Sequence, residues 1–220
     1  MRIKRLMGTI WAAYDDEKGV IIDGGKKMDE KRLLRKVNKL GVKIEYILMT
    51  HTHYDHTGCV EALRKATGAK VVVGKGEAQY LREGHTPVPK GTNAFFRMIG
   101  NAGHNKMPKA VEFYSPVTQD IIEISEDTAI EIDGMDIKAV PLGAHSVGSV
   151  GYVIGDSLFA GDVVFGVMHL IYPWFADFTD DIEAAWEKIL KSGAKFIYPG
   201  HGRRLDMEYF EKKYTERFGQ

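Results

Sequence analysis

The sequence predicts an α+β fold in which two β-sheets pack together with helices outside them. Two blocks of short apolar strands, each accompanied by helix patterns, carry this prediction. The composition agrees, because 220 residues with 44% apolar and 27% charged side chains suffice for a well-packed core. No repeat or low-complexity linker divides the chain, so we expect a single domain over 1–220 with a helical insertion or lid at about 77–120.

The first block alternates between strands and helices. The apolar run at 6–13 predicts a first strand that leads into a hairpin at 15–19, and a short strand follows at 20–22. Leucine and valine at i, i+1, i+4 and i+7 then predict a helix that ends at Gly41. The block closes with a strand at 44–49, a helix at 60–66 and a strand at 71–73.

The second block follows a looser segment at 77–120, where four prolines surround two short helix patterns. An amphipathic helix is predicted at 182–190, and Gly193 ends it. Strands are predicted at 121–124, 129–132, 137–140, 150–154, 157–160 and 196–198.

The charge balance and the cysteine count exclude several classes of protein. Thirty basic residues against thirty acidic ones disfavour a nucleic-acid binder and a polybasic membrane anchor. A single cysteine permits neither an internal disulfide framework nor a four-cysteine zinc site. The uncharged stretches are poor candidates for a spanning helix, and the N-terminal apolar run lacks a convincing cleavage site. We therefore expect a cytoplasmic protein without a membrane partner.

One segment concentrates residues that bind metals. The stretch Thr50-His51-Thr52-His53-Tyr54-Asp55-His56-Thr57-Gly58 follows an apolar strand directly and precedes a helix. Neutral imidazole and carboxylate are natural ligands for zinc and similar divalent ions. With eight histidines in 220 residues, a chance cluster of three beside an aspartate is improbable, so the segment predicts a metal site.

Three further candidate ligands lie just past the carboxyl ends of apolar runs, beside glycines: His145, Asp162 and His201. Sites in sheet-based folds are commonly built where strand ends meet. Seven ligands are too many for one tetrahedral ion and suit two ions that share a bridge. Only a carboxylate has two oxygens with which to bridge, so the bridging residue is Asp162 or Asp55.

Together these seven residues resemble the ligand set of the metallo-β-lactamase superfamily, in the same order along nearly the whole chain. The resemblance implies a four-layer αββα sandwich with a two-metal site at one sheet edge. It assigns the first ion to His51, His53 and His145. It assigns the second ion to Asp55, His56 and His201, with Asp162 as the bridge.

The resemblance also implies metal-assisted hydrolysis by a hydroxide held between the two ions. Asp55 is expected to act as the catalytic residue that orients the nucleophile and shuttles a proton. Asp23 is expected to orient a ligand histidine, and Ser146 to fix the loop around His145. Zinc is the favoured metal, with iron, manganese and nickel as alternatives.

Differences between this sequence and individual branches of the superfamily narrow the range of possible substrates. True β-lactamases typically carry Cys or Ser where Asp162 stands, and flavodiiron reductases usually carry Glu where His53 stands. Hydroxyacylglutathione hydrolases match all seven ligands but add a glutathione-binding C-terminal domain, whereas only nineteen residues follow His201 here. We expect hydrolysis of an ester, lactone or thioester. A phosphodiesterase or ribonuclease of the same fold and a non-hydrolytic diiron redox protein are the alternatives.

Residues outside the motif suggest a possible substrate pocket at His169, Trp174 and Phe95. Burial in an interface would explain His169 and Trp174 equally well, and a helix face packed on the sheet is the favoured alternative for Phe95. Cys59 is expected to be a buried packing residue, and His85 and His104 surface or capping residues. Two loaded ions would attract an anionic small molecule. A homodimer is left open.

Overall fold

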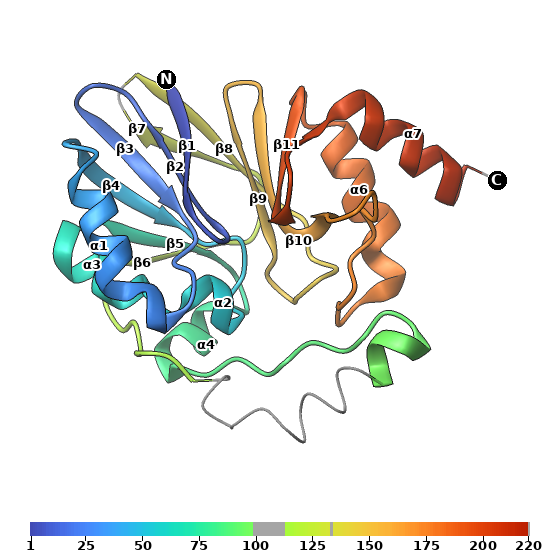
Figure 1. Ribbon diagram of the computed structural model, residues 1–220, viewed down its shortest axis with the longest axis horizontal. Helices are drawn as coiled ribbons and strands as arrows, with labels where there is room; N and C mark the ends of the chain where they lie inside the picture. The colour runs from blue at the N-terminus through green and yellow to red at the C-terminus, as the bar shows by residue number, and fades with distance from the viewer. Residues whose placement is uncertain (99–112, 133, 220) are drawn as a thin grey trace. The chain divides into compact units, whose positions relative to one another are not determined.

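The computed structural model describes residues 1–98, 113–132 and 134–219. The chain divides into two compact units. Unit 1 comprises Met1–Val88 and Met107–Ile124, and unit 2 comprises Pro89–Lys106 and Ser125–Gln220. Each unit is built on one six-stranded mixed sheet with helices beside it (Figure 1).

The sheet of unit 1 has its strands in sequence order. An antiparallel hairpin region, β1–β3, adjoins a parallel region, β3–β6. The strands are β1 (Arg2–Met7), β2 (Ile10–Tyr14), β3 (Lys18–Ile22), β4 (Lys43–Leu48), β5 (Lys70–Gly74) and β6 (Ile121–Ile124). The helices are η1 (Lys27–Asp29), α1 (Glu30–Asn38), α2 (Tyr54–Thr57), α3 (Val60–Thr67) and α4 (Ala78–Glu83).

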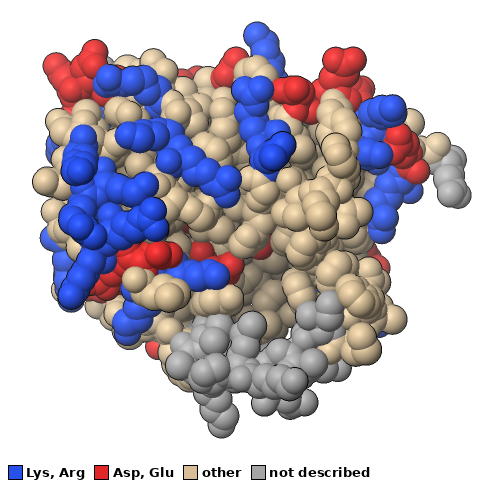
Figure 2. All heavy atoms as spheres, viewed as in Figure 1, with Lys and Arg blue, Asp and Glu red and all other residues tan. Residues whose placement is uncertain are grey.

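The core of unit 1 follows from the strand register. Ile21, Ile47 and Val71 lie side by side on β3, β4 and β5. They are fully buried in one cluster with Leu33 of α1 and Leu63 of α3. The opposite face of α1 carries exposed lysines and arginines, which Figure 2 shows gathered over this part of unit 1. The apolar stripe of each helix thus fixes it on the sheet, and the charged stripe stays solvated.

The sheet of unit 2 runs in the order β12-β11-β10-β9-β8-β7, and only its β10–β11 pair is parallel. The strands are β7 (Thr128–Ile132), β8 (Met135–Pro141), β9 (Val150–Ile154), β10 (Ser157–Gly166), β11 (Phe196–Gly202) and β12 (Leu205–Asp206). The helices are η3 (Thr179–Asp181), α6 (Ile182–Leu190) and α7 (Met207–Phe218).

Trp186 of α6 is the centre of the unit 2 core. Its indole N–H donates to the Val163 carbonyl of β10 at 2.9 Å, and its ring lies 4.8 Å from the Phe210 ring of α7. Both side chains are fully buried. Helix α6 is therefore attached to β10, the strand that carries Asp162, and α7 packs against α6.

Three features differ from the sequence prediction. The run predicted as one strand at 6–13 is broken at Gly8, whose φ of +47° allows a turn between β1 and β2. Strands β10 and β11 continue past their predicted ends, so Asp162 and His201 lie within strands rather than beyond them. Helix α7 was not predicted, because Phe210 is its only fully buried residue.

The looser segment contains the helices that the pattern indicates. Helix α4 is present, and residues 94–98 are helical. Residues 99–112 of the expected lid, with His104 among them, lie outside the described residues. No helix in the described part of the chain is long and apolar enough to cross a bilayer.

Candidate metal centre

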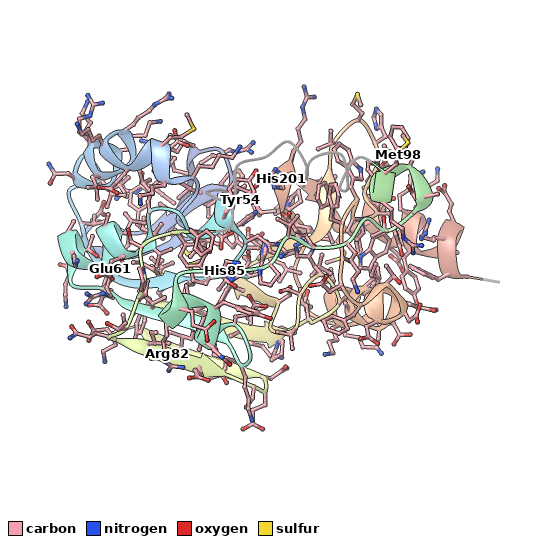
Figure 3. All side chains as sticks on the ribbon, turned by 90° about the horizontal axis from the view of Figure 1, so that it is seen from below. Tyr54, Glu61, Arg82, His85, Met98 and His201 are labelled. Carbon is pink, nitrogen blue, oxygen red and sulfur yellow. The ribbon has the colours of Figure 1, made fainter. Side chains whose placement is uncertain are left out.

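Unit 1 gathers four of the predicted ligands at the end of β4. The loop after this strand carries His51 and His53, and helix α2 carries Asp55 and His56. The His51 ring lies 4.7 Å from the His53 ring and 4.1 Å from the His56 ring. Ligand atoms of Asp55 and His56 lie within 4.8 Å of one another. The three rings are buried, and Asp55 is half-buried at the start of the helix. Figure 3 labels its neighbour Tyr54.

Asp23 connects three parts of this loop. It follows β3 with a φ of +61°, a conformation that residues other than glycine rarely adopt. Its carboxylate accepts hydrogen bonds from the Thr50 amide at 2.8 Å and the Thr50 hydroxyl at 2.9 Å. It also accepts from His56 Nδ1 at 2.8 Å. Asp23 therefore holds both the strand end and a ligand ring.

These hydrogen bonds determine which nitrogen of each ring carries the proton. The Thr50 hydroxyl has a single hydrogen, which it gives to Asp23. Toward His51 Nδ1, at 3.1 Å, the hydroxyl must therefore accept, so the proton lies on Nδ1. His56 Nδ1 likewise donates to Asp23. In both rings the lone pair lies on Nε2, the form in which a neutral histidine binds a metal.

A second buried carboxylate, Glu77, holds the same loop and was not predicted. It accepts from the Thr52 amide at 3.0 Å and, through a short hydrogen bond, from the Thr52 hydroxyl. Thr52 lies between His51 and His53 in the chain. Glu77 is fully buried at the start of α4. One feature of the sequence could have indicated such an acceptor. In Thr50-His51-Thr52-His53 two hydroxyls alternate with the imidazoles, and buried hydroxyls need hydrogen-bond acceptors.

A directed chain of hydroxyls leads to Glu77. Thr86 donates to the Thr52 hydroxyl at 3.1 Å, so Tyr114, at 2.7 Å from Thr86, must donate to Thr86. Burial raises the pKa of Tyr114, which keeps this phenol protonated as the first donor. Each hydroxyl gives one hydrogen bond and receives the next. The loop is thereby fixed to segments on either side of 99–112.

Cys59 lies where the sequence analysis expected it, buried at the start of α3 with 1% exposure. Its thiol donates to the Lys26 carbonyl at 3.0 Å. Burial, helped by the charges of Glu30 and Asp29, raises its pKa to about 12. It is therefore a protonated packing residue at neutral pH.

Unit 2 contributes His145, Asp162 and His201 from three separate segments. One oxygen of Asp162, Oδ2, lies 3.4 Å from His201 Nε2 and 4.0 Å from His145 Nε2. His201 belongs to β11, where Figure 3 labels it, and Asp162 belongs to the neighbouring β10. The parallel pairing of these two strands brings their functional ends to the same side.

Backbone and rings orient the unit 2 histidines. His145 Nδ1 donates to the Phe175 carbonyl at 2.8 Å, which leaves the lone pair on Nε2, the atom that faces Asp162. The His201 ring stacks on Phe165 at 5.5 Å. Ser146 lies in the same loop as His145, and its hydroxyl lies 2.7 Å from that of Ser149.

The residues suggested for a substrate pocket differ in their surroundings. His169 and Trp174 line a cavity within unit 2. Phe95 is 60% exposed and does not line it. His85 belongs to unit 1, where its ring lies 4.7 Å from Phe113.

The comparison with protein families agrees with this geometry. The family model described as "Metallo-beta-lactamase superfamily" matches residues 3–201. The chain belongs to this superfamily. Relatives include a hydroxyacylglutathione hydrolase of Albidiferax ferrireducens, 26% identical over 71% of this chain and 47% of the relative. Another hydroxyacylglutathione hydrolase, from Haemophilus influenzae, is 25% identical over 86% of this chain and 82% of the relative.

A further relative also carries the name of a hydrolase. A probable polyketide biosynthesis zinc-dependent hydrolase of Bacillus velezensis is 21% identical over 71% of this chain and 54% of the relative. The chain thus spans about half the length of some curated relatives that it matches.

Solved structures show the fold. The BLEG-1 B3 metallo-β-lactamase has a TM-score of 0.73 at 21% identity, covering 92% of this chain and 90% of that one. An archaeal superfamily protein from Sulfolobus tokodaii has a TM-score of 0.66 at 18% identity, covering 94% of this chain and 78% of that one. The predicted α+β fold of the metallo-β-lactamase type is confirmed.

Proposed function

We propose that this superfamily member hydrolyses an ester, lactone or thioester of a small, anionic molecule with two divalent metal ions, zinc first among them. We assign one ion to His51, His53 and His145. The other is assigned to Asp55, His56 and His201, with Asp162 shared.

One observation within unit 2 carries the proposal of a shared ligand. A single oxygen of Asp162 lies 3.4 Å from His201 Nε2 and 4.0 Å from His145 Nε2. A carboxylate oxygen that faces two ligand nitrogens from different segments suits a bridge between two ions.

The donor set also fits a divalent metal. His51, His56 and His145 each have Nδ1 committed as a donor, to Thr50, Asp23 and the Phe175 carbonyl respectively. Each therefore presents Nε2 in the neutral form that zinc binds. All three rings are buried, which suits neutral imidazoles better than charged ones.

When bound, divalent ions at such a site lower the pKa of water toward neutrality and polarise a carbonyl oxygen. Residues of the chain itself orient the proposed ligands. Asp23 and Glu77 fix the loop that carries His51 and His53, so the ligands need little reorganisation. The half-buried carboxylate of Asp55 can hold a proton after bond cleavage. Burial, helped by the charge of Asp55, raises the pKa of Tyr54, so its phenol remains a hydrogen-bond donor beside Asp55.

The names of the relatives support carbonyl substrates over phosphodiesters. Two relatives are called hydroxyacylglutathione hydrolases and one a zinc-dependent hydrolase of polyketide biosynthesis. Hydroxyacylglutathione is a thioester, and its hydrolysis requires the same polarised carbonyl.

The test combines metal analysis with a panel of esters, lactones, thioesters and phosphodiesters, run on metal-free and zinc-loaded protein. We expect two ions per chain and turnover of carbonyl substrates only in the loaded form. Turnover restricted to bis-aryl phosphodiesters or RNA would contradict the substrate class. Saturation at a single ion would contradict the shared ligand.

A further inference from the structure

The balanced total charge of the chain hides an uneven distribution. Unit 1 carries eighteen lysines and arginines against fourteen acidic residues, and unit 2 carries twelve against sixteen. The expectation that the chain has no membrane partner rested on the total charge, which averages over the two units. The positive charge of unit 1 is concentrated in residues 26–39, which include η1 and α1 and which we call the basic segment.

The basic segment exposes six cations that have no carboxylate partner among the residues that the structure describes. They are Lys26, Lys27, Lys31, Arg32, Arg35 and Lys39. Figure 2 shows lysine and arginine side chains gathered over this part of unit 1. Elsewhere in the unit exposed cations are paired, for example Lys65 with Glu61 at 3.2 Å and Arg82 with Glu123 at 2.7 Å. The basic segment thus differs from the rest of the unit in leaving its charges uncompensated.

This pattern of charge does not stabilise the helix that carries it. Lys31 and Arg35 are four residues apart, as are Arg35 and Lys39, and like charges at this spacing destabilise a helix. Lys31 and Arg32 also lie in the first turn of α1, where the helix dipole favours acidic residues. A surface that only needs solvation mixes the two signs of charge. The pattern therefore points to an anionic partner that relieves the repulsion.

The cations form a stripe on the side of α1 that faces away from the core. Leu33 and Val37 are buried on the inner side. Positions 28, 31, 32, 35 and 39 are exposed and follow helical spacing along the outer side. The ends of the segment are fixed, because the Lys26 carbonyl accepts from the Cys59 thiol and Lys36 Nζ donates to the Leu6 carbonyl at 2.6 Å. The stripe is therefore presented on a folded helix.

An apolar side chain projects from the same stripe. Met28 is 89% exposed and directly follows Lys27 in the chain. No aromatic residue occurs between 26 and 39. Surfaces that bind single-stranded nucleic acid combine cations with aromatic rings on which the bases stack. Surfaces that bind anionic bilayers combine clusters of roughly four to eight lysines and arginines with apolar side chains that enter the interface. The basic segment matches the second pattern.

We propose that the basic segment docks unit 1 on a bilayer surface rich in anionic phospholipids, with the six exposed cations against the phosphates and Met28 in the headgroup region. Peripheral binding of this kind needs no spanning helix. Each cation near such a surface contributes about fivefold to the binding constant, so the segment suffices for reversible attachment. The inference goes beyond the hydrolase proposal and does not depend on it.

The binding test is co-sedimentation of the zinc-loaded chain with phosphatidylcholine vesicles that either contain or lack phosphatidylglycerol. We expect binding to the vesicles with phosphatidylglycerol and none to those without it. The binding should fall steeply as sodium chloride is added, because salt screens exposed charges beyond about 8 Å at physiological ionic strength. Equal binding to the two kinds of vesicle, or no binding to either at low salt, would overturn the proposal.

Two triple variants locate the surface. Lys31→Gln/Arg32→Gln/Arg35→Gln should weaken binding to the anionic vesicles about 100-fold. Glutamine forms helices nearly as well as lysine and arginine, so zinc content and thermal unfolding should stay unchanged. The control removes three exposed charges from unit 2, with Lys188→Gln/Lys195→Gln/Lys212→Gln, and should change binding little. Equal losses in the two variants would show that only net charge matters and would overturn the assignment to the basic segment.

Met28→Gln separates a bilayer from a nucleic acid as the partner. It should weaken vesicle binding about threefold, because an apolar side chain leaves the interface. Poly(U) RNA at the same phosphate concentration and salt should bind more weakly than the anionic vesicles, and Met28→Gln should not affect it. Tighter binding of poly(U) than of the vesicles would make RNA the partner and would overturn the assignment to lipid.

Discussion

The two units position the proposed metal ligands in different ways. Unit 1 places four of them within six residues, on one loop and the helix that follows it. Two buried carboxylates, Asp23 and Glu77, fix that loop from the end of β3 and the start of α4. Unit 2 takes its three ligands from separate segments and orients them with a backbone carbonyl and a stacked ring. The first arrangement depends on local sequence and the second on strand register.

This difference predicts which substitutions should disturb metal binding in each unit. Side-chain carboxylates can be removed by a single substitution, whereas the carbonyl of Phe175 survives any change of its side chain. In unit 1, substitutions of the residues that hydrogen-bond the proposed ligands should therefore lower zinc affinity strongly. In unit 2, mainly substitutions of the proposed ligands themselves should lower it.

The largest effect is expected from Asp162→Ala. The change removes the oxygen that faces both His145 and His201, so tight binding of one ion and turnover should both be lost. Metal analysis by mass spectrometry and steady-state kinetics measure this. Asp136→Ala, an exposed change on β8 of the same unit, is the matched control. Activity that survives Asp162→Ala would show that the bridge is assigned wrongly.

Asp23→Asn should have the next largest effect. The Thr50 amide donates to one carboxylate oxygen of Asp23 and His56 Nδ1 to the other, and in asparagine one of these two oxygens is replaced by an NH2 group that cannot accept. We expect zinc affinity to fall about 10- to 100-fold, the usual cost of losing an acceptor behind a ligand histidine. Competition with a chelator dye measures the affinity, and the exposed Asp16→Asn is the control. An unchanged affinity would refute the orienting role.

Glu77→Gln should weaken zinc binding less, by roughly three- to tenfold, because Glu77 acts on the loop through Thr52 rather than on a ligand. Thr52→Val removes the hydroxyl that donates to Glu77. A double-mutant cycle should show that the two changes together cost about as much as the larger one alone. Fully additive losses would indicate that the two residues act independently.

Phe165→Leu tests the ring that supports His201 in unit 2. It removes the 5.5 Å stack but leaves all hydrogen bonds in place. We expect a loss in zinc affinity of no more than about threefold, since a stacked ring pair contributes modestly. A loss of zinc affinity as large as that of Asp23→Asn would show that the two units do not differ in how they orient the proposed ligands.

The smallest functional effect is expected from Cys59. Because burial raises the pKa of the Cys59 thiol to about 12, the thiol stays protonated at pH 8, so a disulfide reagent should react with it only after unfolding. The folded pKa lies above the unfolded value near 9.0, so the folded state holds this proton more tightly. The contribution to stability is therefore full below pH 9 and is lost as the pH rises toward 12. Cys59→Ala should reduce the alkaline loss of stability and leave turnover unchanged, as thermal unfolding across pH and kinetics would show.

The candidate ligands of unit 1 stand out in the sequence because they are contiguous and follow a strand directly, and the structure places their side chains close together. The sequence predicted His145, Asp162 and His201 only from their places near strand ends. The sequence did not predict the residues that hold the loop through Thr52. Glu77, Thr86 and Tyr114 come together through tertiary contacts, which no local sequence pattern records. Strand lengths were also underestimated where Gly161 and Pro199 interrupt the apolar pattern, although pairing continues with register shifts.

The central claim is that both units bind the same ions, and zinc content of His53→Ala, His145→Ala and the double variant tests it most directly. Each is dialysed against buffered zinc at a free concentration that saturates the unaltered chain, and bound zinc is counted per chain. The account predicts that each single variant loses one ion and that the double variant loses no more, because both histidines serve one ion. A double variant that loses a further ion would show that the two units bind metal separately, which would contradict the account.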